Sequence, residues 1–154
     1  MSPQRGPITR QTDLFDDRPP VKAPDLVIFT DGACFGNPGP AAAAAVVTCN
    51  GEVIVERTLY LGESTNNRAE YEAVILALAA AAELGAASVT LRTDSQLVAR
   101  QITGRYKIKN PGLKPLLDKI KELSGKFKFK VVEIPREENS RADRLAKNCI
   151  KDSS

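Results

Sequence analysis

Hydrophobic and polar positions along the chain predict a group of strands first and alternating helices and strands later. Residues 26–29 form a continuous apolar run, which is typical of a central strand buried on both faces. Residues 41–49 and 53–61 predict two further strands, and the Asn50-Gly51 pair between them favours a two-residue hairpin. These three segments indicate an antiparallel meander at the start of the folded domain.

The second half of the chain alternates between helical and strand patterns. Apolar residues recur at helical spacing within 66–84, and residues 127–134 alternate in the pattern of a half-exposed strand. Helices are expected at 66–84, 95–102, 113–123 and 140–150, and strands at 89–93 and 127–134. We therefore predict an α/β fold. Its five-stranded mixed sheet would combine an antiparallel meander with parallel strands and would be flanked by helices.

The composition of the chain changes near residue 25. Residues 1–24 are polar and contain several prolines, so we expect a disordered N-terminal tail, a folded domain over 25–151 and a short C-terminal tail over 152–154. The tail lacks the apolar stretch of a secretory signal, and no apolar run is long enough to cross a bilayer, so no membrane partner is expected. The three cysteines show no paired spacing, which favours a reducing cytoplasm. We expect a cytoplasmic monomer.

Charge and the absence of one residue type restrict the chemistry. The net charge is +3, and Lys and Arg residues gather between positions 100 and 130. This pattern favours a phosphate-bearing partner, or else marks a solvated surface. The chain has no histidine, which excludes a Ser-His-Asp triad, the two-histidine zinc motif on a helix and RNA cleavage by paired histidines. Hydrolysis would therefore need carboxylates, metals or both.

Four acidic residues fall where the predicted elements meet at one edge of the sheet. Asp31 and Asp94 end two strands that a right-handed crossover would make parallel and adjacent. Glu70 and Asp143 fall in the first turns of predicted helices. Together, four clustered carboxylates need cations to neutralise them, which favours a Mg²⁺ site.

Each acid also has a structural interpretation when it is considered alone. Asp31 could stabilise a glycine-rich turn, and Asp94 could cap the helix that follows it. Glu70 has the capping-box spacing from Asn67, and Asp143 suits a helix dipole. Only the four positions taken together favour the metal site.

Each acid lies in a longer motif, and the four motifs occur in a fixed order along the chain. They are TDGACFGNPGP at 30–40, TNNRAE at 65–70, TDSQLV at 93–98 and REENSRADRLA at 136–146. These blocks resemble type 1 ribonuclease H, and the match covers about residues 26–149. The resemblance implies a ribonuclease H-like fold. It also implies an endonuclease that cleaves the RNA strand of RNA–DNA hybrids and leaves 5′-phosphate and 3′-hydroxyl ends.

The resemblance also implies a set of catalytic residues and cofactors. Two Mg²⁺ ions per site are expected, with Mn²⁺ as a substitute, since two ions ~3.5–4 Å apart suit phosphodiester displacement. The residues implied as both metal ligands and catalytic acids are Asp31, Glu70, Asp94 and Asp143.

Further residues are implied to contact the nucleic acid. Asn37, Asn67 and Gln96 match positions facing the minor groove, where the 2′-hydroxyl distinguishes RNA from DNA. Asn37 could also be an ordinary turn residue, and Asn67 could be a helix cap. The full set of implied substrate-binding residues is Gly32, Cys34, Asn37, Thr65, Asn66, Asn67, Arg68 and Gln96.

The chain departs from the family in two places. Many members carry a histidine before the last acid, where this chain has Pro135-Arg136. Arg136 is either an auxiliary catalytic cation that helps the product to leave or a surface arginine. Some members carry an extra basic helix after the third block, for which residues 105–112 leave no room. Substrate binding would then depend on scattered lysines or be weaker.

The N-terminal tail contains a second resemblance. Residues 11–15, with the sequence QTDLF, resemble the pentapeptide with which bacterial replication and repair proteins bind the sliding clamp. Gln11 would supply amide hydrogen bonds, and Leu14 and Phe15 would fill an apolar pocket on the clamp. The alternative is a tail without a partner that exposes two apolar residues.

Three other functions stay open from the sequence. The first is a non-catalytic module that binds hybrids, although retention of all four acids argues against it. The second is a DNA-processing nuclease of the same fold, although Asn37, Asn67 and Gln96 argue against it. The third is a clamp-tethered adaptor without chemistry. Fold alone does not decide among them.

Overall fold

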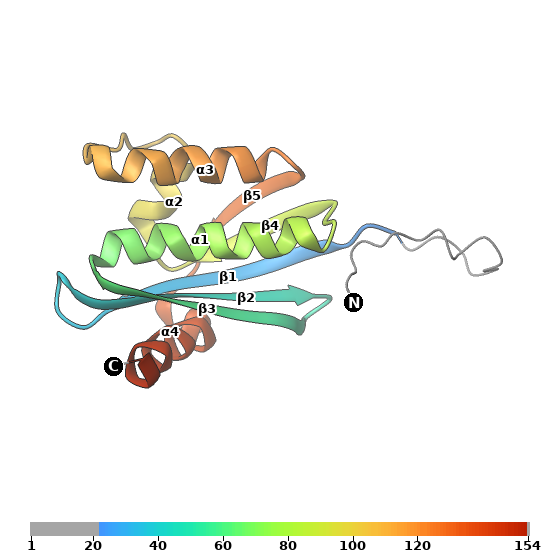
Figure 1. Cartoon of the computed structure of the whole chain (residues 1–154). Coiled ribbons are helices and arrows are strands. Elements are labelled where there is room, and N and C mark those ends of the chain that lie inside the picture. Colours follow the sequence, from blue (N-terminus) through green and yellow to red (C-terminus); the bar gives the residue numbers. More distant parts are fainter. Residues whose placement is uncertain (1–21, 154) are drawn as a thin grey trace.

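A five-stranded mixed sheet, with helices on both faces, makes up the part of the chain that the computed structural model describes, residues 22–153 (Figure 1). The strand order is β3-β2-β1-β4-β5. The strands are β1 (Asp25–Cys34), β2 (Gly39–Cys49), β3 (Glu52–Ser64), β4 (Ser88–Thr93) and β5 (Lys128–Glu133). The α-helices are α1 (Asn66–Glu83), α2 (Gln96–Ile102), α3 (Lys114–Ser124) and α4 (Ser140–Ser153), with short 3₁₀ helices η2 (Pro111–Leu113) and η3 (Arg136–Asn139). The predicted fold class is confirmed.

Strand β1 lies at the centre of the sheet and pairs differently along its two edges. Residues 25–29 pair in parallel with β4, whereas residues 27–34 pair antiparallel with β2. We expected the strand to stop near Phe29, with Asp31 at its end. The structure instead places Asp31 inside β1, because β2 continues the ladder and pairs Asp31 with Ala44. Asp31 is therefore held by hydrogen-bonded backbone rather than by a turn.

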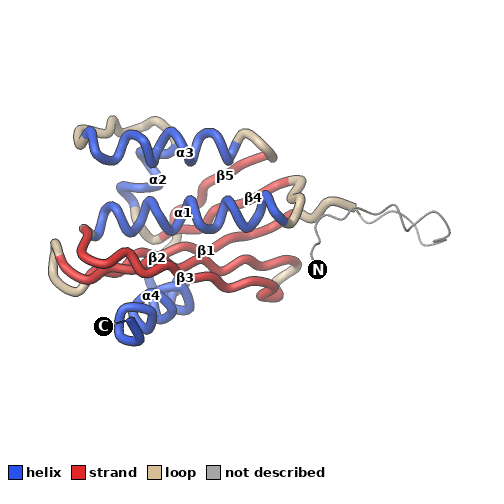
Figure 2. The backbone as a smooth tube through the Cα atoms, in the orientation of Figure 1, coloured by secondary structure: helices blue, strands red, loops and turns tan. Residues whose placement is uncertain are grey.

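Two hydrophobic cores fix the layers of the domain. β2 carries five consecutive alanines, 41–45, all fully buried, and these small side chains let helices approach both faces of the sheet. Ala45 belongs to the larger core under α1, while Ala42 and Ala44 pack with Ala146 and Ile150 of α4. Figure 2 shows the result, with α1 on one face of the sheet and α4 on the other.

Helix caps differ from those that the sequence suggested. Thr65 is the N-cap of α1, since its hydroxyl accepts a hydrogen bond from Arg68 N at 3.2 Å. Asn67 lies within the helix and Glu70 in its second turn, so the capping-box interpretation and the first-turn placement of Glu70 are wrong. Ser95 caps α2, so the interpretation of Asp94 as a cap is also wrong. The two acids are thereby left without a capping role.

The boundaries of some elements also differ from the prediction. α4 continues to Ser153, so residues 152–153, which we expected in a C-terminal tail, are helical. Between α2 and α3 the chain contains only η2, in agreement with the expected absence of an extra basic helix. Residues 1–21, including Gln11, Leu14 and Phe15, lie outside the described residues. No helix within 22–153 combines the length and apolar character needed to cross a membrane.

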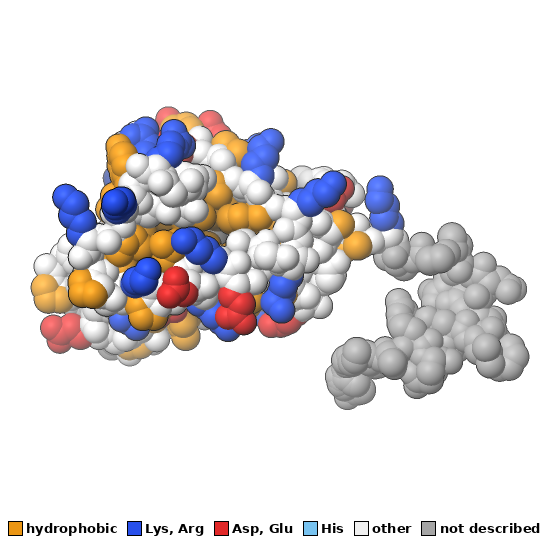
Figure 3. Space-filling view, turned by 90° about the horizontal axis from the view of Figure 1, so that it is seen from above, with side chains coloured by type: hydrophobic (Ala, Val, Ile, Leu, Met, Phe, Trp, Pro, Cys, Tyr) orange, Lys and Arg blue, Asp and Glu red, His pale blue; other side chains and the backbone are white. Residues whose placement is uncertain are grey.

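The face of the molecule that carries α1 and α3 shows both apolar and positively charged side chains. Apolar side chains show along its middle, and Lys and Arg side chains stand around its rim (Figure 3). The Lys and Arg residues between positions 100 and 130 are distributed over α2, α3, β5 and the loops that join them. This distribution agrees with the expectation of scattered lysines rather than one basic helix.

β1 comes very close to α1 at Gly32. A Cβ atom there would lie only 2.4 Å from the main chain at Ala69 and at Glu70. The N–H of Gly32 donates to Glu70 Oε1 at 2.7 Å. The missing side chain therefore lets the strand and the helix bring Asp31 and Glu70 side by side.

We predict that Gly32→Ala lowers the free energy of unfolding by about 3 kcal/mol, because the strand and the helix would have to separate. Urea denaturation measures the change. Gly125→Ala is the matched control, since a Cβ there would meet its nearest neighbour at 3.5 Å and the residue has φ −70°. Equal stability of the two variants would show that β1 and α1 can separate without cost.

Candidate active site

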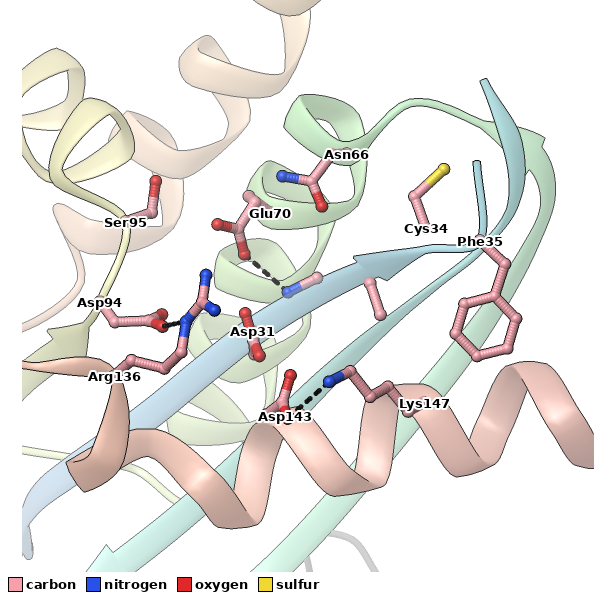
Figure 4. A pocket seen from close by; sticks show the side chains of 12 residues that line it. Asp31, Cys34, Phe35, Asn66, Glu70, Asp94, Ser95, Arg136, Asp143 and Lys147 are labelled. Carbon is pink, nitrogen blue, oxygen red and sulfur yellow. Dashed lines mark hydrogen bonds and ion pairs between the residues drawn. The ribbon is translucent and has the colours of Figure 1, made fainter. Parts of the chain in front are cut away.

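Four carboxylates from four separate parts of the chain line one open cavity of about 390 Å³. Asp31 comes from β1, Glu70 from α1, Asp94 from the residue after β4, and Asp143 from the first turn of α4. Figure 4 shows the four side chains pointing into this common space. The other lining residues are Gly32, Ala33, Cys34, Phe35, Asn66, Ser95, Arg136 and Lys147.

The parallel pairing of β1 with β4 sets the positions of two of the acids. The last parallel pair in the register is Phe29 with Arg92. Asp31 and Asp94 each lie two residues beyond that pair, so both emerge at the same level of the sheet. Carboxyl ends of neighbouring parallel strands commonly form such sites.

Glu70, Asp94 and Asp143 each have a hydrogen bond or an ion pair at a carboxylate oxygen. Besides the bond from Gly32 to Glu70, Asn139 Nδ2 donates to Asp94 Oδ1 at 3.1 Å. Arg136 Nε lies 3.9 Å from Asp94 Oδ2, with its side chain 90% exposed. Lys147 Nζ lies 3.1 Å from Asp143 Oδ2, one turn further along α4. Two cationic side chains therefore stand at the rim of a cavity that contains four acids.

Burial and mutual repulsion perturb the acids at the centre. Burial, followed by the negative charges of Glu70 and Asp94, raises the pKa of Asp31 to about 9. Burial also raises the pKa of Glu70, although the hydrogen bond from the Gly32 N–H opposes this shift. The protein alone therefore does not neutralise the charge that these carboxylates would carry when ionised.

The donor chemistry of the cavity suits a hard divalent cation such as Mg²⁺. Carboxylate oxygens are the ligands that this ion prefers, and an uncompensated cluster of acids attracts it. Within residues 22–153, however, no three His, Cys, Asp or Glu side chains are placed so that they could hold a metal ion as they stand. The donor set therefore fits a cation in kind, and the side chains would have to converge on it.

Comparison with known proteins identifies the family. Residues 29–149 match the family model described as reverse transcriptase-like. The chain is also similar to ribonuclease HI of Halobacterium salinarum, with 39% identity over 92% of this chain and 72% of that protein. This chain belongs to the type 1 ribonuclease H family. It is therefore a ribonuclease H enzyme.

Solved structures of ribonucleases H share its fold. The crystal structure of RNase H1 from Halobacterium salinarum NRC-1 has 40% identity and a TM-score of 0.81, covering 83% of this chain and 98% of that one. LC11-RNase H1, solved in complex with an RNA/DNA hybrid, has 40% identity and a TM-score of 0.80, covering 84% and 99%. The bifunctional protein Rv2228c of Mycobacterium tuberculosis is 40% identical over 81% of this chain, which spans only 35% of that protein.

Three of the expected substrate-binding residues line the acidic cavity of this ribonuclease H. They are Gly32, Cys34 and Asn66. Cys34 is half-buried, and its thiol contacts the main-chain oxygens of residues 36, 39 and 64. Asn37 lies beside this group, since its Oδ1 accepts a hydrogen bond from Asn66 N at 3.1 Å. That bond ties the loop after β1 to the start of α1.

The other expected substrate-binding residues lie outside the acidic cavity. Thr65 caps α1, and Arg68 is exposed and lies 3.7 Å from Glu72. Gln96 is exposed at the start of α2. Asn67 lines a neighbouring cavity of about 510 Å³, together with basic residues of the loop after α2. The residues of that loop in the cavity are Arg105, Tyr106, Lys107, Ile108, Lys109 and Asn110.

Besides Ala33, four residues near the acids were not singled out as site residues from the sequence, although three of them lie within the quoted motifs. Lys147 was recognisable in principle, because it lies four residues after Asp143 on one helical face. Ser95 was recognisable as the polar residue at the start of α2. Phe35 and Asn139 lie within quoted motifs, but only the tertiary fold shows that they come close to the acids.

The raised pKa of Asp31 makes the stability of the metal-free protein depend on pH. A carboxyl with a higher pKa in the folded chain than in the unfolded chain destabilises the fold as pH rises above the unfolded value. For Asp31 this range runs from its ordinary value of 3.8 to about 9. Stability should therefore fall with rising pH across this range.

We predict that Asp31→Asn raises the free energy of unfolding at neutral pH by about 1–3 kcal/mol in the presence of a chelator, because it removes a buried ionisable group. The variant should also lose part of the decline in stability between about pH 5 and pH 9. Urea denaturation across this range measures both effects. Asp118→Asn, at an exposed position on α3, is the control. If the free energy of unfolding of Asp31→Asn changed with pH in parallel with that of the wild type, the raised pKa of Asp31 would be contradicted.

Proposed function

We propose that this ribonuclease H is an endonuclease for the RNA strand of RNA–DNA hybrids and leaves 5′-phosphate and 3′-hydroxyl ends. The observation that supports it is the open cavity lined by Asp31, Glu70, Asp94 and Asp143. The chain has no histidine, so carboxylates and bound cations would have to supply the chemistry. LC11-RNase H1, which is similar in fold and sequence, was solved with an RNA/DNA hybrid, and this supports the class of substrate.

The proposal includes two Mg²⁺ ions, with Mn²⁺ as a substitute, held by the four acids. When bound, such a pair supplies activation of a water molecule and stabilisation of the leaving 3′ oxygen. Asp31 lies between the other three acids and would be shared by both ions (Figure 4). Glu70 is kept in place by the N–H of Gly32, so it would meet a cation with little rearrangement.

The two cationic side chains at the rim have separate tasks in this proposal. Arg136 is largely exposed and lies near Asp94, so it is free to follow the cleaved phosphate as the product leaves. Lys147 Nζ lies 3.1 Å from Asp143 Oδ2 and would have to release this carboxylate to a bound cation. Arg136 is therefore proposed as an auxiliary residue rather than a proton carrier.

Residues of β1, of the loop after it and of the starts of α1 and α2 would contact the substrate. Asn37, Asn67 and Gln96 would face the minor groove and detect the 2′-hydroxyl groups of the RNA strand. Gly32, Cys34, Thr65, Asn66 and Arg68 would complete the binding surface around them. The basic loop beside Asn67 would supply phosphate contacts, which give most of the affinity in nucleic-acid binding.

The cellular setting is also a proposal. Cys34, Cys49 and Cys149 are free thiols, in keeping with a reducing cytoplasm. We propose that the enzyme acts as a monomer, since all four acids come from one chain. We also propose that residues 11–15 bind a bacterial sliding clamp, which would concentrate the enzyme where hybrids arise during replication.

We predict that Asp31→Asn abolishes cleavage of a labelled RNA–DNA hybrid in Mg²⁺, lowering kcat by a factor of about 10³ or more. Binding of the hybrid should persist, because phosphate contacts outside the acidic cavity supply most of the affinity. Gel electrophoresis of the products measures cleavage, with RNA duplex and DNA duplex as parallel substrates and with Mn²⁺ or a chelator in place of Mg²⁺.

Asp118→Asn serves as the control in this assay, because it removes an exposed carboxylate of α3 that does not line the cavity. It should cleave the hybrid at the rate of the wild type. Near-normal turnover by folded Asp31→Asn would contradict the four-carboxylate mechanism. Equal cleavage of the DNA duplex would support the alternative of a DNA-processing nuclease.

We predict that replacing Leu14→Ala and Phe15→Ala together abolishes binding to a bacterial sliding clamp, since these side chains would supply most of the buried apolar area. Hybrid cleavage by the isolated enzyme should stay within about two-fold of wild type, because the folded strands begin at Asp25. A binding titration against the clamp measures the first effect, and Thr12→Ala is the control. Absence of binding by the wild type would reduce the QTDLF segment to a chance match.

A further inference from the structure

Asn139 occupies a position that the proposed mechanism does not use. It is the last residue of η3, and only 1% of its surface is exposed. Its Nδ2 donates two hydrogen bonds, to Thr30 O at 2.8 Å and to Asp94 Oδ1 at 3.1 Å. Thr30 directly precedes Asp31, and Asn139 itself lies four residues before Asp143. One side-chain amide therefore joins three of the four segments that carry the acids.

The orientation of this amide follows from its neighbours. Thr30 O and Asp94 Oδ1 are both acceptors, so the NH₂ group must face them, and a half-turn of the amide would place oxygen against oxygen. Asn139 Oδ1 is buried and accepts no hydrogen bond from any residue in the described part of the chain. An unpaired buried acceptor is unfavourable, so the two donated bonds outweigh it.

Asp94 has few other restraints on this side of the site. The parallel ladder between β1 and β4 stops at Arg92, so Asp94 lies beyond the last paired residue. Its second oxygen, Oδ2, lies 3.9 Å from Nε of the exposed Arg136. Asn139 is therefore the buried contact that fixes how the Asp94 carboxylate is turned.

We propose that Asn139 is a positioning residue that engages Asp94 Oδ1 and thereby turns Oδ2 towards the cation site. The inference rests on the proposed function, in which Asp94 is a cation ligand. Loss of the amide would leave Thr30 O and Asp94 Oδ1 without their donor and would let the carboxylate swing towards Arg136. Hydrogen-bond partners that orient metal ligands typically account for a factor of ~10–100 in metal affinity or activity.

Two variants separate this role from ordinary packing. Asn139→Leu removes both donors at similar volume, and Asn139→Asp keeps the shape but places acceptors where the donors were. Thr48→Val is the matched control, because it removes another hydrogen bond to β1, the partly buried bond from Thr48 Oγ1 to Val27 O at 2.8 Å, from a residue that does not line the acidic cavity. Calorimetric titration with Mn²⁺ measures cation affinity, and urea denaturation in chelator measures stability.

The expected result is a rise of about ten-fold or more in the Mn²⁺ dissociation constant for both Asn139 variants and less than about two-fold for Thr48→Val. All three variants should lose stability. If the Asn139 variants lose stability but keep the Mn²⁺ affinity of the control, Asn139 is only a core residue and the inference is overturned. If Asn139→Leu fails to fold, Asn139→Ser takes its place, because it also removes the amide. The same rise in the Mn²⁺ dissociation constant is then expected.

A double-mutant cycle tests whether the effect passes through Asp94. In an Asp94→Ala background, Asn139→Leu should weaken the remaining Mn²⁺ binding by less than about two-fold. An equal loss of affinity in both backgrounds would overturn the inference.

Failure of this inference can be told apart from failure of the proposed function. If the wild type binds Mn²⁺ and cleaves the hybrid, and the Asn139 variants bind Mn²⁺ as the wild type does, only this inference is contradicted. A wild type that does neither contradicts the proposed function itself.

Discussion

The burial of like charges at one edge of the sheet is the constraint around which this structure is organised. Asp31 is only 7% exposed and lies among three other carboxylates, which is why its pKa rises to about 9. The fold counters this with a few directed contacts, the N–H of Gly32 on Glu70 and the amide of Asn139 on Asp94. The two cores on either face of the sheet provide the apolar burial that can offset such an arrangement.

Much of the fold could be predicted because periodicity and turn chemistry are local properties. The Asn50-Gly51 hairpin adopts the positive φ angles that its sequence favours, and α1 begins at the expected residue. The length of β1 could not be predicted, because its last residues are extended only through pairing with β2. The end of α4 at Ser153 was missed for a similar reason, since polar residues in a last helical turn resemble those of a tail.

The site could be predicted only as far as sequence motifs mark it. The four acids follow from their positions relative to the strands and from the family resemblance, and the structure brings all four to one cavity. The part that was missed consists of tertiary contacts. Asn139 lies 45 residues from Asp94, and the motif around Asn139 does not show that its amide bonds to two separate segments, at Thr30 and at Asp94. The close approach at Gly32 is likewise visible only once α1 lies on β1.

The central claim is that the four carboxylates hold two cations side by side. The most direct test is electron paramagnetic resonance. The full chain is titrated with Mn²⁺ in the presence of a hybrid whose scissile phosphate resists hydrolysis. The account predicts two Mn²⁺ per chain with exchange-coupled signals, as expected for ions ~3.5–4 Å apart, and loss of that coupling in Glu70→Gln. A single uncoupled Mn²⁺, or coupling that survives both Glu70→Gln and Asp31→Asn, would contradict it.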